Sequence, residues 1–212
     1  MPRVTPILRR GSKAVEDLNL LKVLQSEINH ELSIPSQDSA SGAIEGFEVD
    51  WDSSEAQDVV LRRKCMSGEE VAVSALLGPE TSTEGSAFPR QVLMKVCVKK
   101  PGLSSVLQFD CGVYGKGTSS SQFDILHAWY LHSATSPNTA AYRGPEFRTL
   151  DPHLQEALKE YLEARGISES FMNSLLLYLH RKEQGQYVNW LQKLESLVGK
   201  DQTCGTSDPN GF

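Results

Sequence analysis

The sequence lacks the residue groupings that usually hold a metal ion. Its four cysteines are far apart, with no C-x-x-C pair and no neighbouring histidine at a zinc spacing. Its five histidines are also scattered, and none has a second histidine four positions on or an H-E-x-x-H setting. We therefore expect no metal and no other cofactor. Cys65, Cys97 and Cys111 lie in strand-like segments, where free thiols pack as small apolar side chains and suit a reducing compartment.

Motifs for catalysis, membrane insertion and secretion are missing as well. Lys116 is followed by glycine where a phosphate-binding loop needs serine or threonine, and the chain has no G-x-S-x-G elbow. No window approaches the roughly 18 uncharged apolar residues of a membrane span, and there is no N-x-[ST] sequon. These absences disfavour an enzyme, a membrane-inserted protein and an N-glycosylated secreted protein.

The charge is moderately negative. The chain of 212 residues carries 27 acidic and 21 basic side chains, which gives a net charge of −6. Net negative charge opposes nonspecific binding to nucleic acid and favours basic partners. A modest acidity is also the ordinary condition of a protein surface, so charge alone does not separate a binding function from plain solvation.

Leucine and isoleucine recur at helical spacing near the N-terminus and predict an amphipathic helix over 14–32. The stripe consists of Leu18, Leu21, Leu24, Ile28 and Leu32. Six later segments are rich in β-branched residues and predict strands. They span 46–52, 57–65, 69–77, 90–100, 103–113 and 122–132. Because the connections are too short for helical crossovers, we expect an antiparallel meander of six to seven strands.

Helical patterns return in the last third of the chain. Asp151 followed by Pro152 is typical of a helix start, Gly166 of a helix stop, and Ser168 can cap a second helix. After the short EQG break, a further amphipathic pattern covers 186–198. The fold is therefore expected to be α+β, with one N-terminal helix, the meander and two to three C-terminal helices.

We expect a single domain over 14–198. The preceding 1–13 is a basic extension without acidic residues, which is the charge bias of a short mitochondrial presequence or of a frayed terminus. Between the helix and the strands, 35–45 is predicted to be a flexible connector. The polar stretch 78–89 is predicted to be a mobile loop, and 199–212 a disordered tail.

Three carboxylates in the first strand form the most conspicuous polar group. Glu48, Asp50 and Asp52 alternate with apolar residues, which predicts that they share the polar face of a half-buried strand. Such faces are usually only solvated, and catalysis by these acids is disfavoured. Binding of cationic segments is the functional interpretation, while the basic run 62–64 of the next strand can instead pair across to these acids.

The last amphipathic segment needs a partner surface. Its stripe consists of Tyr187, Trp190, Leu191, Leu194, Leu197 and Val198. Burying six such side chains contributes on the order of 10 kcal/mol, which is less than the cost of ordering the segment alone. We expect the stripe to pack on the first helix through residues such as Leu21 and Ile28, with part of both stripes left for a subunit interface. Trp190 is the expected anchor of that interface.

Several C-terminal segments together resemble a known family. They are VLQFDCGVYG, YRGPEF, LDPHLQEALKEYLEARGI and FMNSLLLYLHRKEQGQYVNWLQKLESLV. The chain resembles, over 14–198, the mitochondrial acidic matrix protein family, whose plant members are called the mitochondrial glycoprotein family and whose animal member is the complement-globular-head binding protein. The resemblance implies a seven-stranded sheet flanked by helices, assembled as a ring-shaped homotrimer with an acidic surface and no catalytic centre.

The family has been linked to protein binding in the matrix, to mitochondrial ribosomes and to assembly of respiratory complexes. The resemblance therefore implies a non-enzymatic, chaperone-like scaffold of the mitochondrial matrix, whose partners are further copies of itself and basic proteins or assembly intermediates. The alternatives are a factor associated with RNA or the mitochondrial ribosome and, less favoured, an unrecognised enzyme, with the cytoplasm or nucleus as alternative locations. The chain departs from the family in its short presequence and in the loop 78–89, which carries only Glu80 and Glu84 as acids.

Overall fold

The computed structural model describes residues 6–34, 43–80, 90–116, 120–133, 142 and 144–200. The chain divides into two compact units. One, the helical unit, consists of residues 1–38 and 183–212, and the other, the sheet unit, consists of residues 39–182. Most of the expected loop 78–89, the end of the expected tail and the first five residues of the expected extension lie outside the described residues.

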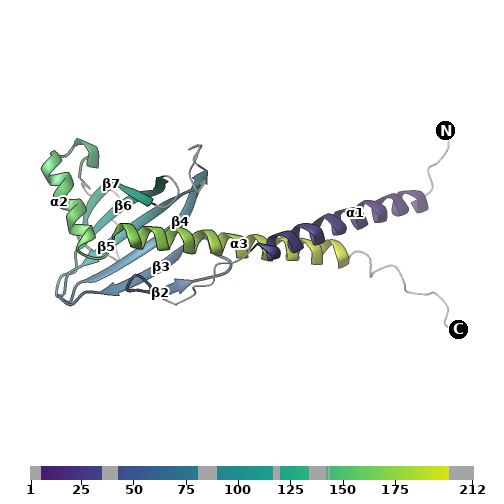
Figure 1. Ribbon diagram of the computed structural model, residues 1–212, viewed down its shortest axis with the longest axis horizontal. Coiled ribbons are helices and arrows are strands. Elements are labelled where there is room, and N and C mark those ends of the chain that lie inside the picture. The colour runs from purple at the N-terminus through teal and green to yellow at the C-terminus, as the bar shows by residue number, and fades with distance from the viewer. Residues whose placement is uncertain are drawn as a thin grey trace. The chain divides into compact units, whose positions relative to one another are not determined.

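The sheet unit is built on a seven-stranded antiparallel sheet (Figure 1). The strands are β1 (Ala43–Ile44), β2 (Phe47–Asp52), β3 (Val59–Lys64), β4 (Glu70–Glu80), β5 (Arg90–Lys99), β6 (Val106–Lys116) and β7 (Ser120–Leu131). Each strand pairs with the one that follows it in the chain, which confirms the predicted meander. The two-residue β1 falls in the stretch predicted to be a connector. It pairs with β2 through a tight turn in which Glu45 and Gly46 both have positive φ, as hairpins of this length require.

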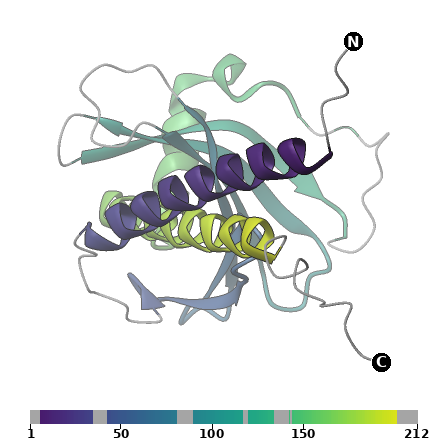
Figure 2. The same cartoon turned by 90° about the vertical axis from the view of Figure 1, so that its right-hand side faces the viewer.

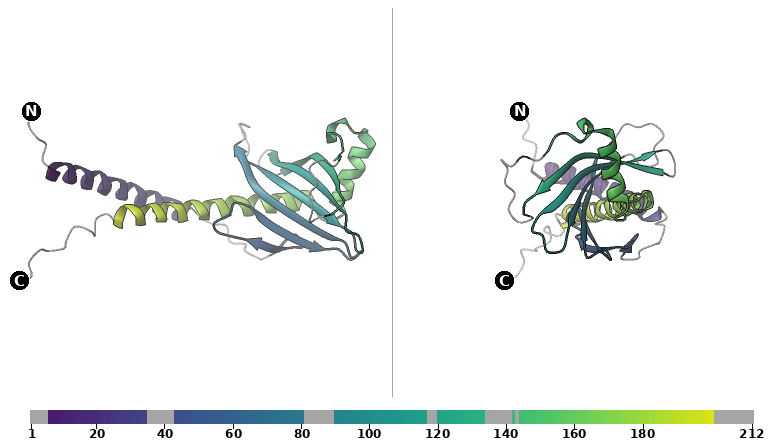
Figure 3. Two further views of the ribbon diagram at one scale, coloured as in Figure 1. Left: turned by 180° about the vertical axis from the view of Figure 1, so that it is seen from behind. Right: turned by 90° about the vertical axis from the view of Figure 1, so that its left-hand side faces the viewer.

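The helices of the sheet unit cover one face of the sheet (Figures 1 and 3). They are the 3-10 turn η1 (Phe147–Thr149), α2 (Pro152–Glu163) and the beginning of α3 (Glu169–Lys200). The alternate side chains of β3 to β6 that face these helices are buried, among them Leu61, Val73, Val96 and Phe109. The ring of Phe171 in α3 lies 4.6 Å from that of Phe47 in β2, which links helix and sheet at the centre of the core.

The predicted helix boundaries of α2 hold, because local hydrogen bonds define them. The Asp151 carboxylate accepts from the backbone N–H groups of His153 and Leu154, at 2.9 and 3.4 Å, and Pro152 is the first helical residue. Gly166 ends the turn after α2 with a φ of 93°. A side chain at Gly166 would collide with the guanidinium of Arg63, so both the backbone angle and the packing require glycine.

The predicted break at EQG is wrong, because α3 continues from Glu169 to Lys200. A single glycine in a helix costs only about 1 kcal/mol relative to alanine, and the glutamate and glutamines around Gly185 are good helix formers. The chain therefore has two C-terminal helices, and the expected tail begins no earlier than residue 201, which lies outside the described residues.

The helical unit contains α1 (Pro6–Ser33) and the residues of α3 from Glu183 onward, which run side by side (Figure 2). Helix α1 begins eight residues before the predicted start at position 14. The two helices are antiparallel, since Gln184 bonds to Glu31 whereas Glu195 bonds to Gln25. Among the described residues, no helix has a stretch that is both long and apolar enough to cross a lipid bilayer.

Candidate binding surfaces

The strand that carries the predicted acidic face is irregular. One extra residue, Asp50, is accommodated by a β-bulge between β2 and β3. Beyond the bulge the alternation of side chains is shifted by one residue, so Asp52 stands opposite Val59, which is fully buried in the core. The prediction of one shared face is therefore wrong: Glu48 lies on the face without helices, and Asp52 lies on the helix-covered face. The same shift leaves Trp51, predicted to be on the apolar face, 43% exposed.

The two outward carboxylates face basic residues of β3. Asp50 accepts a hydrogen bond from Nε of Arg62 at 2.6 Å, and this bond raises the pKa of the guanidinium. Both side chains are about half exposed, so the pair contributes at most about 1 kcal/mol to stability. Glu48 lines a hollow of about 340 Å³ together with the basic run 62–64 and Glu70. Negative charge on this part of the sheet is therefore largely offset by neighbouring cations.

Asp52 is used inside the sheet unit. Its carboxylate accepts hydrogen bonds from the Lys182 ammonium and the Tyr178 hydroxyl of α3, and Lys182 also donates to the backbone oxygen of Asp58 at 2.7 Å. Burial raises the pKa of Asp52, but the hydrogen bonds and charge of its partners outweigh burial, so the pKa lies below its usual 3.8. Burial and the bond to Asp52 raise the pKa of Tyr178 to about 12. Asp52 thus holds α3 on the sheet.

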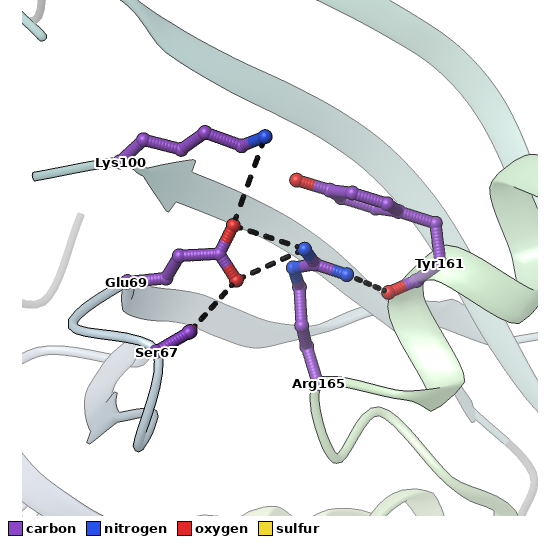
Figure 4. A network of polar contacts seen from close by, with 5 residues as sticks. All are labelled: Ser67, Glu69, Lys100, Tyr161 and Arg165. Atoms are coloured by element: carbon purple, nitrogen blue, oxygen red, sulfur yellow. Dashed lines mark hydrogen bonds and ion pairs between the residues drawn. The ribbon is translucent and has the colours of Figure 1, made fainter.

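A second ion-pair network joins α2 to the turn between β3 and β4 (Figure 4). Nη2 of Arg165 lies 3.0 and 2.9 Å from the two carboxylate oxygens of Glu69, to which Ser67 also donates at 3.2 Å. The Arg165 guanidinium stacks on the Tyr161 ring, 3.4 Å from its centroid, and donates to the Tyr161 carbonyl oxygen. Lys100 stands 3.9 Å from Glu69 on the exposed side.

The Arg165 pair is more than four-fifths buried on both sides. The hydrogen bond from Arg165 lowers the pKa of Glu69 and outweighs burial, which acts in the opposite direction. Neither partner of this pair was singled out from the sequence, because they are 96 residues apart and each is an ordinary charged residue of a turn or helix end.

In the helical unit the structure brings together four of the predicted packing residues. Ile28 and Leu191 are buried with Leu24 in a small core, and Leu194 packs against it. Leu21 is half-buried. Tyr187 and Trp190, in contrast, are 38% and 53% exposed and are not part of this core. Their rings stack on each other at a centroid distance of 6.0 Å and an interplanar angle of 21°.

Three polar contacts between described residues of α1 and α3 are made by neutral donors. The Tyr187 hydroxyl donates to Oε1 of Glu27 at 3.2 Å, and the side-chain amide of Gln25 donates to Oε1 of Glu195 at 3.0 Å. Gln184 donates to the backbone oxygen of Glu31 at 3.4 Å. Hydrogen bonds of this kind satisfy the carboxylates and leave their negative charge in place. The sequence does not reveal this pattern, because the partners are 153 to 170 residues apart along the chain.

The described residues contain no group of three or more histidine, cysteine, aspartate or glutamate side chains that could hold a metal ion. Cys65, Cys97 and Cys111 are free thiols. Cys111 is buried in the core, where burial raises its pKa to about 12. These three cysteines therefore act as packing residues of the sheet unit.

The sequence pattern of the mitochondrial glycoprotein family, MAM33, matches residues 24–198. The chain belongs to this family. It is 28% identical over 192 residues to an uncharacterized mitochondrial protein of Arabidopsis thaliana, with 84% of this chain and 74% of that protein covered. It is 31% identical over 111 residues to the mitochondrial acidic protein mam33 of Schizosaccharomyces pombe, with 48% of this chain and 39% of that protein covered. The family and its relatives confirm the predicted mitochondrial location.

Two solved structures share the fold. The p22 protein of Trypanosoma brucei superposes with a TM-score of 0.67 at 21% identity, covering 87% of this chain and 99% of that one. A Leishmania major protein, described as a sequence homologue of human p32, superposes with a TM-score of 0.66 at 17% identity, covering 86% and 99%. These similarities confirm the predicted α+β architecture.

Proposed function

We propose that this protein is a non-enzymatic scaffold of the mitochondrial matrix that self-associates and binds basic proteins or assembly intermediates. The observation that supports this proposal most directly is the kind of hydrogen-bond donor that contacts the carboxylates of the helical unit. Glu27 and Glu195 are hydrogen-bonded by tyrosine and glutamine, so at these contacts their charges are not cancelled by a lysine or arginine among the described residues. Over 15–34 and 183–199 the chain has six carboxylates and two lysines, whereas the first turns of α1 add Arg9, Arg10 and Lys13 and the end of α3 adds Lys200. The two helices of this unit together are therefore balanced in charge, and the excess of negative charge is local to the stretch that contains Glu27 and Glu31.

Exposed negative charge can attract a partner protein even where the surface has no deep pocket. Exposed carboxylates attract a basic surface over about 10 Å at 0.1 M salt, and the attraction weakens as salt rises. Such contacts raise association rates and select basic partners, while each contact contributes modestly to affinity. This behaviour fits a scaffold that holds several clients in turn, and it requires no catalytic group.

Self-association is supported by apolar side chains of the helical unit that its own small core leaves exposed. They are Val15, Leu18, Leu20, Val23, Leu32 and Leu197, which are between 46% and 70% exposed. Single exposed leucines are common, but six exposed apolar side chains on one helix pair are available for burial against a second copy. We expect a homotrimer, which light scattering of the purified protein tests directly: a mass near that of one chain would refute it.

Calorimetric titration of the full-length protein with a lysine-rich peptide tests the binding function. Binding should be measurable at low salt, weaken as salt is added, and vanish with a peptide in which glutamine replaces lysine. No heat with the lysine-rich peptide at low salt would refute the proposal. A parallel titration with single-stranded RNA addresses the alternative, since RNA bound more tightly than the peptide would identify a factor associated with RNA or the ribosome.

A further inference from the structure

Two glutamates of α1 stand on one side of the helix pair, and no described lysine or arginine pairs with them. Glu27 and Glu31 are one turn apart, both half-buried, and neither forms an ion pair with a described residue. Like charges at this spacing repel each other and weaken a helix. The only described side-chain donor to either carboxylate is the neutral hydroxyl of Tyr187. The pair therefore has unmet capacity to accept hydrogen bonds from a positive group.

Two aromatic rings of α3 adjoin these glutamates. Tyr187 donates to Glu27, and the ring of Trp190 stacks on that of Tyr187. Trp190 is 53% exposed, although the helical unit closes its own core with Leu24, Ile28 and Leu191. The negative surroundings are visible at the phenol, where burial, the bond to Glu27 and the charges of Glu27 and Glu31 together raise the pKa of Tyr187.

We propose that Glu27, Glu31, Tyr187 and Trp190 form a recognition site for a lysine or arginine side chain in a basic segment of a partner protein. Carboxylates supply charge-assisted hydrogen bonds, and the open face of an indole ring attracts a cation through its π-electrons. The inference rests on the proposed function and names the residues that perform it. It places the site on the helical unit and not on Glu48, Asp50 and Asp52.

The composition of the site favours a cationic occupant over an apolar one. An apolar surface packed on the stacked rings of Tyr187 and Trp190 would meet the Glu27 carboxylate, to which the Tyr187 hydroxyl donates. Burying a carboxylate without a positive partner is costly. A lysine or arginine side chain avoids this cost, because its methylene stem covers the rings while its charged head meets the carboxylates. Lys193, one turn beyond Trp190, already has contacts of its own within the described residues.

The test compares two charge-matched double variants of the full-length protein in titrations with the lysine-rich peptide at low salt. Glu27→Gln with Glu31→Gln removes two charges at the site, and Glu48→Gln with Asp50→Asn removes two charges on the sheet unit. We expect the first pair to weaken binding about tenfold and the second to change it less than about twofold. Trp190→Leu should weaken binding about threefold, because leucine keeps the apolar contact and loses the π-system.

The possible outcomes distinguish failure of the proposed site from failure of the proposed function. If the wild-type protein does not bind the peptide, the proposed function fails and the site with it. If the wild-type protein binds and the Glu27/Glu31 variant binds equally well, the site is refuted while the function stands. If Trp190→Leu lowers the mass measured by light scattering, Trp190 belongs to a subunit interface, as the sequence suggested, and the site is refuted. An unchanged melting temperature for each variant would show that peptide binding was compared on folded protein.

Discussion

Carboxylates in the two units of this protein differ in the side chains that they contact. In the sheet unit, Asp50, Asp52 and Glu69 each meet an arginine or lysine, so the charge is neutralised where it stands. In the helical unit, Glu27 and Glu195 meet a phenol and an amide, which complete their hydrogen bonds without neutralising them. A net charge of −6 therefore says little about where a basic partner would bind. Whether the negative charge of an acid is available to a basic protein depends on the side chain that already binds its carboxylate.

Asp110 and Asp124 of the sheet unit do not follow this contrast. Asp110 accepts from the Gln108 amide at 3.0 Å, and Asp124 accepts from the Tyr114 hydroxyl, whose pKa burial and this bond raise to about 12. Asp110 stands directly opposite Lys95 of β5, a cross-strand position at which opposite charges attract. The contrast is therefore clearest at particular helix contacts. Ion pairs attach α2 and α3 to the sheet, whereas neutral donors bind Glu27 and Glu195 between α1 and α3.

The largest expected effect comes from breaking an ion pair of the sheet unit. Arg165→Met removes the buried cation of Glu69 and leaves only the exposed Lys100 at 3.9 Å. We expect a loss of about 3 kcal/mol in the free energy of unfolding, measured in urea. The double variant Arg165→Met with Glu69→Gln is the control. It should recover much of the loss, because no uncompensated charge remains. A single variant as stable as the wild type would show that the pair is not structural.

The second-largest effect is expected at acid pH, where the ion pairs of the sheet unit should lose their contribution to stability. The pKa values of Asp52 and Glu69 in the folded protein are lower than their usual values of 3.8 and 4.5, so the unfolded chain binds more protons. Their contribution to stability is complete above about pH 5 and is lost as the pH falls through the folded-state pKa values. Stability measured by urea unfolding from pH 6 down to pH 3 should fall less steeply in a variant with Asp52→Asn and Glu69→Gln. An equal slope would contradict the assignment.

A smaller effect is expected in the helical unit at Gly185. A Cβ added there meets no atom within 4 Å, and the residue is helical. Gly185→Ala should therefore raise the free energy of unfolding by about 0.5 to 1 kcal/mol and slow hydrogen exchange in this part of α3. Gly166→Ala is the contrasting control in the sheet unit, and should destabilise because of its positive φ and the guanidinium of Arg63. A destabilising Gly185→Ala would indicate that the helix must bend there.

The smallest expected effect comes from giving the helical unit an ion pair of the kind the sheet unit uses. Gln25→Lys places an ammonium near Glu195, whose Oε1 now accepts from the Gln25 amide. Because the pair is exposed, the gain in stability should be only about 0.3 kcal/mol. Affinity for the lysine-rich peptide should fall slightly, and Gln25→Met distinguishes the added charge from the lost hydrogen bond. A rise in peptide affinity would argue against charge as the basis of binding.

Much of the architecture was predictable because its signals are local. The alternation of apolar residues located six strands, short connections required a meander, and Asp151 with Pro152 marked the start of α2. The predictions that failed depended on distant partners. A bulge opposite β3 placed Asp52 on the other face of the sheet, and α3 continued through Gly185 where the sequence suggested a break.

The sequence by itself determined the α+β class, the order of the elements and part of the stripes that join α1 to α3, since these follow from periodicity and local capping. It determined the family through the resemblance of particular segments to known members. Only the tertiary structure decided which acids keep their charge. Asp52 lies 130 residues from Lys182, and Glu27 lies 160 residues from Tyr187. Whether a carboxylate meets an ammonium or a hydroxyl depends on strand register and helix packing over these separations, and no pattern of neighbouring residues encodes it.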